Sequence, residues 1–382
     1  MISYCYQNNC LYTDVFVYSG GTVDITAHRI AKDEKMEEIL PSSGGDWGGM
    51  NVNREFIYKL GEIFGNDFLN RYKSKYPQDW VDLYNEFEMS KKPYNGKEMN
   101  SLCIRFPWSF GEYHTEIKEG KQIKTAVREF GCPNITFTNG MMTLKNDAAN
   151  GLFTPVLTDF TTHVRQLLKN PKLSDCKYIF MVGGFSESRF LQEEVKTHFE
   201  IKGTKVLIPS DAQLTVLKGA VLFGHFPTEI KARIARKTYG YGLSDIFDAK
   251  IHDPKRKFTN KEGEEFCKGV FVTLVKQGES VPVGHEITDT SYPQSKNTTS
   301  SRIRIYCIDG QPDHPVQYTD SPGVECIGQV VTKHPPCYHY KENAMTDIFT
   351  FGSTELHVRS IHNATGNEFT SSFGFASDPS PK

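Results

Sequence analysis

The sequence lacks any apolar run close to the roughly 18 residues that a membrane-spanning helix requires. Its first residues, MISYCYQNNCLYTD, contain neither the basic stretch nor the long apolar stretch of a secretory signal. No charge of one sign is in excess, since the net charge is −2 at pH 7, which argues against nucleic acid or an anionic membrane as a partner. The nine cysteines show no repeated spacing, so free thiols in a reducing compartment are expected. The sequence therefore predicts a cytoplasmic protein with no membrane and no nucleic-acid partner.

Metal-binding patterns are also scarce. His334, Cys337 and His339 lie close together in sequence, but no fourth ligand follows at a spacing typical of zinc sites. The basic residues at 255–257 form a short cluster that is typical of a solvated loop. No metal site is therefore predicted.

Periodicity divides the chain into a mixed region followed by a β-rich region. In residues 1–227, short apolar runs alternate with helical patterns, and a helical insert is expected at about 46–135. In residues 238–376, short β-branched and aromatic runs are separated by Pro, Gly, Asn and Asp, which indicates strands. Residues 228–237 are expected to form a linker and residues 377–382 a disordered tail.

Two strand patterns in the mixed region each end at paired glycines. An apolar run at 15–18 leads into Ser19-Gly20-Gly21, and the alternating stretch at 22–27 then predicts a hairpin. Tyr178–Val182 is a continuous apolar run of the kind found in strands buried on both faces, and Gly183-Gly184 ends it.

Glycine turns that follow strands let backbone N–H groups approach phosphate oxygens, because no Cβ stands in the way. An aspartate shortly after such a turn, here Asp24, can hold a metal-bound water. One glycine pair is more often an ordinary hairpin turn. Two pairs, in this order and with these flanking strands, are a more specific signal of a nucleotide site.

Several segments within roughly residues 10–225 resemble motifs of the 70-kDa heat-shock proteins. The segment SGGTVD at 19–24 resembles their second phosphate-binding hairpin, and MVGGFS at 181–186 is similar to their adenosine motif. Gly48-Gly49 matches the glycine pair that opens the small subdomain of the second lobe. The pattern ExxKKxxN at 88–95 resembles the family's helix that contacts adenine and ribose, and Asp211 with its following helix matches the segment that closes the site. The amino-acid sequences of these segments are most similar to those of the divergent 12A/12B-like subfamily.

The resemblance implies the second lobe of an actin-like (hexokinase/heat-shock) ATPase fold. It implies ATP or ADP with Mg²⁺ as cofactors, and client polypeptides or co-chaperones as partners of a chaperone-like protein. By position, Thr22 and Asp24 would take part in catalysis. The adenine nucleotide would be contacted by Ser19, Gly20, Gly21, Gly49, Glu88, Lys91, Lys92, Gly183, Gly184, Phe185 and Asp211. The β-rich region is similar to the opening of the family's substrate domain, with an unrelated β-sandwich as the alternative.

Three departures from the family pattern bear on hydrolysis. Val17 stands where the family has an aspartate that arranges Mg²⁺ and the attacking water, and Ser19 replaces the first glycine. The chain is also expected to begin too late to contain the family's first lobe. Because phosphoryl transfer depends on positioning and electrostatics, weak or absent hydrolysis is expected. The alternatives are a non-catalytic interaction module that kept the fold, and a sugar-kinase relative, against which the β-rich region argues.

Overall fold

The chain forms two compact units, one of residues 1–30 and 42–227 and the other of residues 31–41 and 228–382. The computed structural model describes residues 12–18, 21–30, 35–200, 203–226, 230–310, 317–335, 337, 339–351 and 355–374. Among these described residues, no helix is both long and apolar enough to cross a membrane.

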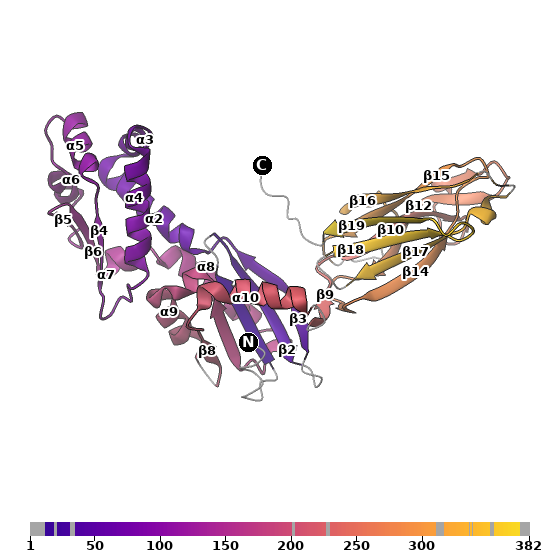
Figure 1. Cartoon of the computed structure of the whole chain (residues 1–382), viewed down its shortest axis with the longest axis horizontal. Helices are drawn as coiled ribbons and strands as arrows, with labels where there is room; N and C mark the ends of the chain where they lie inside the picture. Colours follow the sequence, from indigo (N-terminus) through magenta and orange to yellow (C-terminus); the bar gives the residue numbers. More distant parts are fainter. Residues whose placement is uncertain are drawn as a thin grey trace. The chain divides into compact units, whose positions relative to one another are not determined.

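A mixed sheet forms the centre of the first unit (Figure 1), with the strand order β3-β2-β1-β7-β8. The strands are β1 (Tyr12–Tyr18), β2 (Val23–Ile30), β3 (Met36–Gly45, whose residues 36–41 belong to the second unit), β7 (Tyr178–Val182) and β8 (Lys205–Leu207). The β1–β2 pair is antiparallel, so the predicted hairpin is confirmed, and β1–β7 and β7–β8 are parallel. Because parallel strands end at the same edge of a sheet, the ends of β1 and β7 lie side by side.

The helices that precede and follow β7 and β8 in the chain belong to the same unit. They are α7 (Asn146–Asn150), α8 (Thr154–Leu167), α9 (Arg189–Phe199) and α10 (Ala212–His225), with short 3-10 turns η1 (Pro171–Leu173) and η2 (Gly184–Glu187). α8 begins with a proline in its first turn, as predicted, and buries an apolar stripe that includes Val156, Phe160 and Val164.

The predicted end of α10 is wrong by a residue or two. Gly224 does not close the helix, which runs on to His225, because its backbone continues in helical conformation through the glycine. Asp211 occupies the predicted N-cap position, but its side chain makes no capping hydrogen bond. It forms an ion pair with Lys218 instead.

A second subdomain of the first unit is inserted between β3 and α7. Its helices are α2 (Gly49–Phe64), α3 (Asn66–Lys75), α4 (Pro77–Lys91), α5 (Trp108–Ile117) and α6 (Ile123–Phe130). A three-stranded sheet of order β4-β6-β5 completes it, formed by β4 (Ser101–Arg105), β5 (Ile135–Thr138) and β6 (Met141–Lys145). The insert predicted at about 46–135 is therefore longer than expected and not purely helical.

Aromatic side chains fill the core of this insert. Phe56 of α2 and Phe87 of α4 stack with their ring centroids 4.2 Å apart, and both are fully buried. Phe64, Phe68 and Phe110 form further edge-to-face pairs. This packing fixes α2 against α4, the two helices whose ends meet the glycine turns of the sheet.

The second unit is built from strands. They are β9 (Ile230–Ile234), β10 (Thr238–Ile246), β11 (Lys257–Thr259), β12 (Glu265–Val275), β13 (Ser280–Pro282), β14 (His285–Ser291), β15 (Ser300–Ile308), β16 (Val324–Lys333), β17 (Met345–Phe351), β18 (Glu355–His362) and β19 (Glu368–Gly374). Short 3-10 turns, η4 (Pro254–Arg256) and η5 (Tyr340–Asn343), interrupt them. The prediction that 228–237 is a linker is wrong for most of its length, because β9 pairs there with β13 and with the start of β3.

Two sheets of the second unit share one apolar core. The five-stranded sheet has the order β11-β12-β10-β15-β16 and the four-stranded sheet the order β14-β17-β18-β19. Tyr241 of β10 stacks on Phe349 of β17 at 4.9 Å, so side chains from the two sheets meet directly. This is the packing of a β-sandwich.

Candidate functional site

The turn after β1 contacts the start of the helical insert. The backbone N–H of Gly48 donates to the carbonyl of Gly21 at 3.0 Å. A Cβ added to Gly48 would lie 2.4 Å from the carbonyl carbon of Gly21, so only glycine permits this approach. The first residue of α2, Gly49, is therefore held next to the hairpin turn.

The glycine turn after β7 contacts the same helix end through Phe185. A Cβ on Gly49 would lie 3.0 Å from Cδ2 of Phe185 and 3.3 Å from Nζ of Lys91. Gly183 adopts a positive φ of 95°, and its N–H donates to the carbonyl of Ala212 at 2.8 Å. The two glycine turns, the start of α2, the end of α4 and the start of α10 thus form one connected group of contacts.

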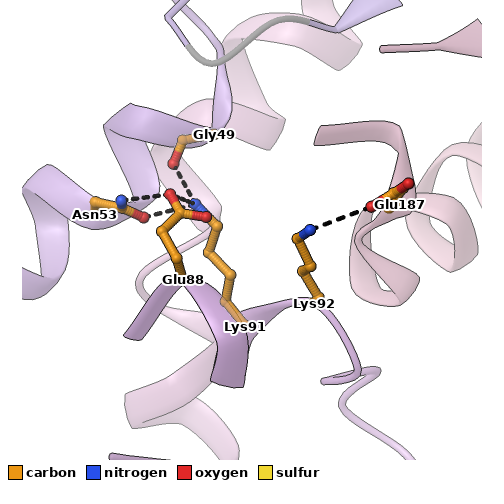
Figure 2. A network of polar contacts seen from close by, with 6 residues as sticks. All are labelled: Gly49, Asn53, Glu88, Lys91, Lys92 and Glu187. Atoms are coloured by element: carbon orange, nitrogen blue, oxygen red, sulfur yellow. Dashed lines mark hydrogen bonds and ion pairs between the residues drawn. The ribbon is translucent and has the colours of Figure 1, made fainter. Parts of the chain in front are cut away.

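Lys91 is the centre of a buried polar network (Figure 2). Its ammonium group donates to the carbonyl of Gly49 at 2.9 Å, to Oδ1 of Asn53 at 2.6 Å and to Oε1 of Glu88 at 2.6 Å. These acceptors match the three N–H donors of a lysine. The side chain is 3% exposed, and burial lowers the pKa of Lys91, an effect that the adjacent Glu88 opposes. Lys91 is thus placed to position α2 against α4.

Glu88 and Lys92 are more accessible than Lys91. Glu88 also accepts a hydrogen bond from Nδ2 of Asn53, yet its side chain is 32% exposed. Lys92 points away from Lys91 and forms an ion pair with Glu187 at 3.3 Å, which joins α4 to the turn η2 (Figure 2). The backbone N–H of Arg189 donates to the carbonyl of Lys92 at 3.1 Å, so this joint has a backbone contact too.

The two predicted catalytic residues lie at the start of β2. Thr22 and Asp24 are both exposed, and the hydroxyl of Thr22 donates to Oδ2 of Asp24 at 3.5 Å. Val17 lies opposite Asp24 in the β1–β2 ladder and opposite Val182 in the β1–β7 ladder, so the position at which the family has an aspartate is next to both turns.

The remaining predicted contacts divide as follows. Gly184 is exposed, with open space where a side chain would stand. The ion pair with Lys218 lowers the pKa of Asp211. Ser19 and Gly20 lie outside the described residues. Among the described residues, no group of three or more His, Cys, Asp or Glu side chains could hold a metal ion.

Sequence reasoning missed Asn53 and Glu187. Asn53 is fully buried and directly follows Val52, which belongs to the apolar stripe of α2. A polar residue beside such a stripe is the sequence signal that could have indicated a buried hydrogen-bonding side chain. Glu187 follows the second glycine pair by three residues, and only the folded chain shows that it faces Lys92.

No family model matches the chain. It is 34% identical over 351 residues to heat shock 70 kDa protein 12A of Mus musculus, an alignment that covers 91% of this chain and 51% of that protein. The human 12A protein is 33% identical over the same length and coverage. Human heat shock 70 kDa protein 12B is 30% identical over 369 residues, which is 94% of this chain and 53% of that protein. The chain belongs to the heat shock 70 kDa protein 12A/12B subfamily.

Membership of the 12A/12B subfamily confirms the resemblance inferred from the motifs. The chain spans about half the length of the curated relatives that it matches. Among solved structures it is similar to a pCBH ParM non-polymerisable quadruple mutant, with a TM-score of 0.31, 13% identity and coverage of 56% of this chain and 47% of that one. A likeness at that level supports no argument about the fold.

Proposed function

We propose that the first unit is the second lobe of an actin-like ATPase and binds an adenine nucleotide, ATP or ADP. The observation that supports this most directly is the meeting of both glycine turns at the start of α2, where Gly48 contacts Gly21 and Gly49 lies against Phe185 and Lys91. A site of this kind offers backbone N–H groups and a helix N-terminus to phosphates, and a glycine surface to a nucleoside.

The proposed roles follow the accessibility of each side chain. The nucleoside lies against the turn of Gly183 and Gly184, and the partly exposed carboxylate of Glu88 accepts a hydrogen bond from a ribose hydroxyl. Lys92 lies beside the base. Lys91 has no N–H left for a ligand, so it acts as a positioning residue that holds Glu88 and Gly49.

The phosphates lie toward Gly21, Thr22 and the start of α2. Thr22 and Asp24 are the candidate residues for hydrolysis at this end, with Asp24 as the carboxylate that would hold a Mg²⁺-bound water. Asp211 lies at the start of α10, next to the turn of Gly183.

Hydrolysis in this chain is proposed to be weak or absent. Valine at position 17 has no oxygen with which to bind Mg²⁺ or orient water, and phosphoryl transfer requires both. The same residue favours a second candidate function, a non-catalytic module that uses the fold for interaction alone.

For the whole protein we propose a chaperone-like role in the cytoplasm, with client polypeptides or co-chaperones as partners. The second unit would then be the substrate domain. All seven described cysteines are free thiols, which fits a reducing compartment.

Isothermal titration calorimetry with ATP and ADP, with and without Mg²⁺, tests the proposal. Binding that does not require Mg²⁺ is expected, because the nucleoside contacts supply most of the affinity. Absence of heat with both nucleotides would overturn the proposal and favour the interaction module.

A glycine substitution separates binding from folding. Gly184→Ala places a methyl group in open space where the nucleoside is proposed to lie, so stability stays unchanged while affinity falls by about tenfold or more. Gly219→Ala on α10 also adds a methyl group in open space and serves as the matched control that binds normally. Equal affinities for the two variants would exclude the nucleoside from the Gly184 turn.

A further inference from the structure

The loop between β3 and α2 is held by a histidine from a distant helix. A hydrogen bond joins Oγ of Ser43, on β3, to Nε2 of His163, on α8, at 3.0 Å. The ring of His163 also packs on the indole of Trp47, with centroids 5.1 Å apart and planes at 50°. Ser43, Trp47 and His163 are called the loop clamp below.

The loop clamp is connected to the proposed phosphate end of the site by short backbone contacts. A Cβ on Gly45 would lie 2.6 Å from the indole of Trp47, so the ring lies directly against that glycine. Trp47 is followed by Gly48, whose N–H donates to Gly21. A shift of Trp47 therefore moves the residue that joins the start of α2 to the hairpin turn.

The surroundings of His163 favour its neutral form. Burial lowers the pKa of His163, with no carboxylate among the described residues that offsets the effect. Asp46, the acidic residue of the loop, has its carboxylate held by Asn51 at 3.1 Å and Arg54 at 3.4 Å, and Asp159, one turn earlier on α8, is exposed. A proton on the ring would put a charge in a partly buried position, at a desolvation cost that no carboxylate among the described residues offsets.

We infer that the loop clamp is a proton-sensitive positioning device, which holds the start of α2 against the Gly21 turn while His163 is neutral and loosens when His163 is protonated. The inference rests on the proposed function, because a loosened α2 would then bind the phosphates less tightly. His163 has a lower pKa in the folded chain than in the unfolded one, so its contribution to stability is present above the ordinary histidine pKa of about 6.5 and is lost as the pH falls through the folded value.

The clamp is tested first without nucleotide, by the fluorescence of Trp47. The chain has three tryptophans, so the double substitution W80F/W108F leaves Trp47 as the only one. Between pH 8 and pH 5, with the far-ultraviolet circular dichroism unchanged, its emission is expected to change with a midpoint below about 6.5. The same change should be absent when His163→Phe is combined with W80F/W108F, because phenylalanine keeps an aromatic ring but cannot bind a proton. Emission independent of pH in the parent, or an identical change in H163F, would overturn the clamp.

The link to the site is tested by titrating MgATP at pH 7.5 and pH 5.5 into the chain and into H163F. Affinity is expected to fall by about tenfold more at the lower pH in the chain than in H163F, a typical size for a coupling between two sites. The protonation of ATP itself is common to both proteins, so their difference belongs to His163. If emission titrates but ATP binds at neither pH, the proposed function fails and the clamp stands. If ATP binds with the same pH dependence in both proteins, the clamp does not control the site.

Discussion

Lys91 in the first unit and Asp347 in the second are both buried, and the surroundings compensate the two charges differently. In the first unit, Lys91 is surrounded by a carboxylate, an amide oxygen and a backbone carbonyl, all within 2.9 Å of its ammonium group. In the second unit, Asp347 of β17 is 1% exposed and accepts a hydrogen bond from the hydroxyl of Ser360. The lysine has a counter-charge, whereas the aspartate has another carboxylate, Asp289, directly opposite it on β14.

Burial shifts the pKa of both side chains against the charged form. The neighbouring carboxylate opposes this shift for Lys91 and adds to it for Asp347. Burial raises the pKa of Asp347 to about 6, the hydroxyls of Ser291 and Ser360 lower it in part, and Asp289 adds to the increase. Asp289 in turn accepts a hydrogen bond from the hydroxyl of Tyr241, which faces it from β10. A buried charge with matched hydrogen-bond acceptors holds the groups around it in place. A buried charge beside a like charge lowers the stability of the folded unit.

The largest effect is expected for Lys91→Met. The substitution leaves the carbonyl of Gly49 and the amide of the fully buried Asn53 without their donor, so the first unit should lose about 3–5 kcal/mol of stability. Urea unfolding followed by tryptophan fluorescence measures this, because all three tryptophans, at 47, 80 and 108, belong to the first unit. A loss below about 1 kcal/mol would show that the three acceptors do not compensate the charge, and would break the comparison.

Asp347→Asn is expected to stabilise the second unit by about 2–3 kcal/mol at pH 7. The pKa of Asp347 is raised from 3.8 to about 6 on folding, so its neutral form stabilises the unit fully below pH 3.8, and this stabilisation is lost as the pH rises through about 6. Calorimetric melting at pH 5 and pH 7 should show a pH-dependent transition in the parent and a smaller dependence in the variant. A second unit that melts at a lower temperature in D347N at pH 7 would contradict the assignment.

Asn53→Ala sharpens the comparison by removing one acceptor of three. Lys91 would keep Glu88 and Gly49, so the expected loss is about 1–3 kcal/mol, smaller than that of K91M. The double variant K91M/N53A should cost less than the sum of the two single losses, because both disturb the same network. Strict additivity in urea unfolding would mean that the two residues act independently.

The smallest effect is expected for Lys92→Met, the surface counterpart of K91M. The Lys92–Glu187 pair is 44% and 29% exposed, so its loss should cost less than about 1 kcal/mol and should vanish at high salt. Urea unfolding in 0.05 M and 1 M NaCl measures both. A loss of stability equal to that of K91M would mean that exposure to solvent does not determine how much each of the two lysines contributes to stability.

Much of the local structure could be predicted because it depends on neighbouring residues. The continuous apolar run Tyr178–Val182 forms a strand with the predicted ends, and Pro155 stands in the first turn of α8. The strands β4, β5 and β6 were not predicted as a sheet, because each has five residues or fewer and lies among charged residues. β9 was not predicted either, because it is short, contains two basic residues and pairs with segments that are distant in the sequence.

The residues of the candidate site stay a prediction, and the contacts that the structure gives them could not be read from the sequence. Glycine pairs and the ExxKK pattern are visible in the sequence, but the parallel pairing of β1 with β7, which brings the turns together, joins segments about 165 positions apart. Lys91 was predicted to contact nucleotide, whereas its partners Gly49 and Asn53, at 42 and 38 positions away, use its ammonium group. Long-range partners decide such roles, and one sequence does not reveal them.

We expect the surface of α10 to promote self-association in concentrated solution. Large apolar side chains at 45–63% exposure follow one another along it and just beyond its end, at Leu214, Val216, Leu217, Val221, Leu222 and Phe226. Contiguous apolar area of this kind promotes self-association and loss of solubility. Light scattering should therefore rise with protein concentration and fall when a mild detergent is added, so dilute samples are the appropriate ones for every titration described above.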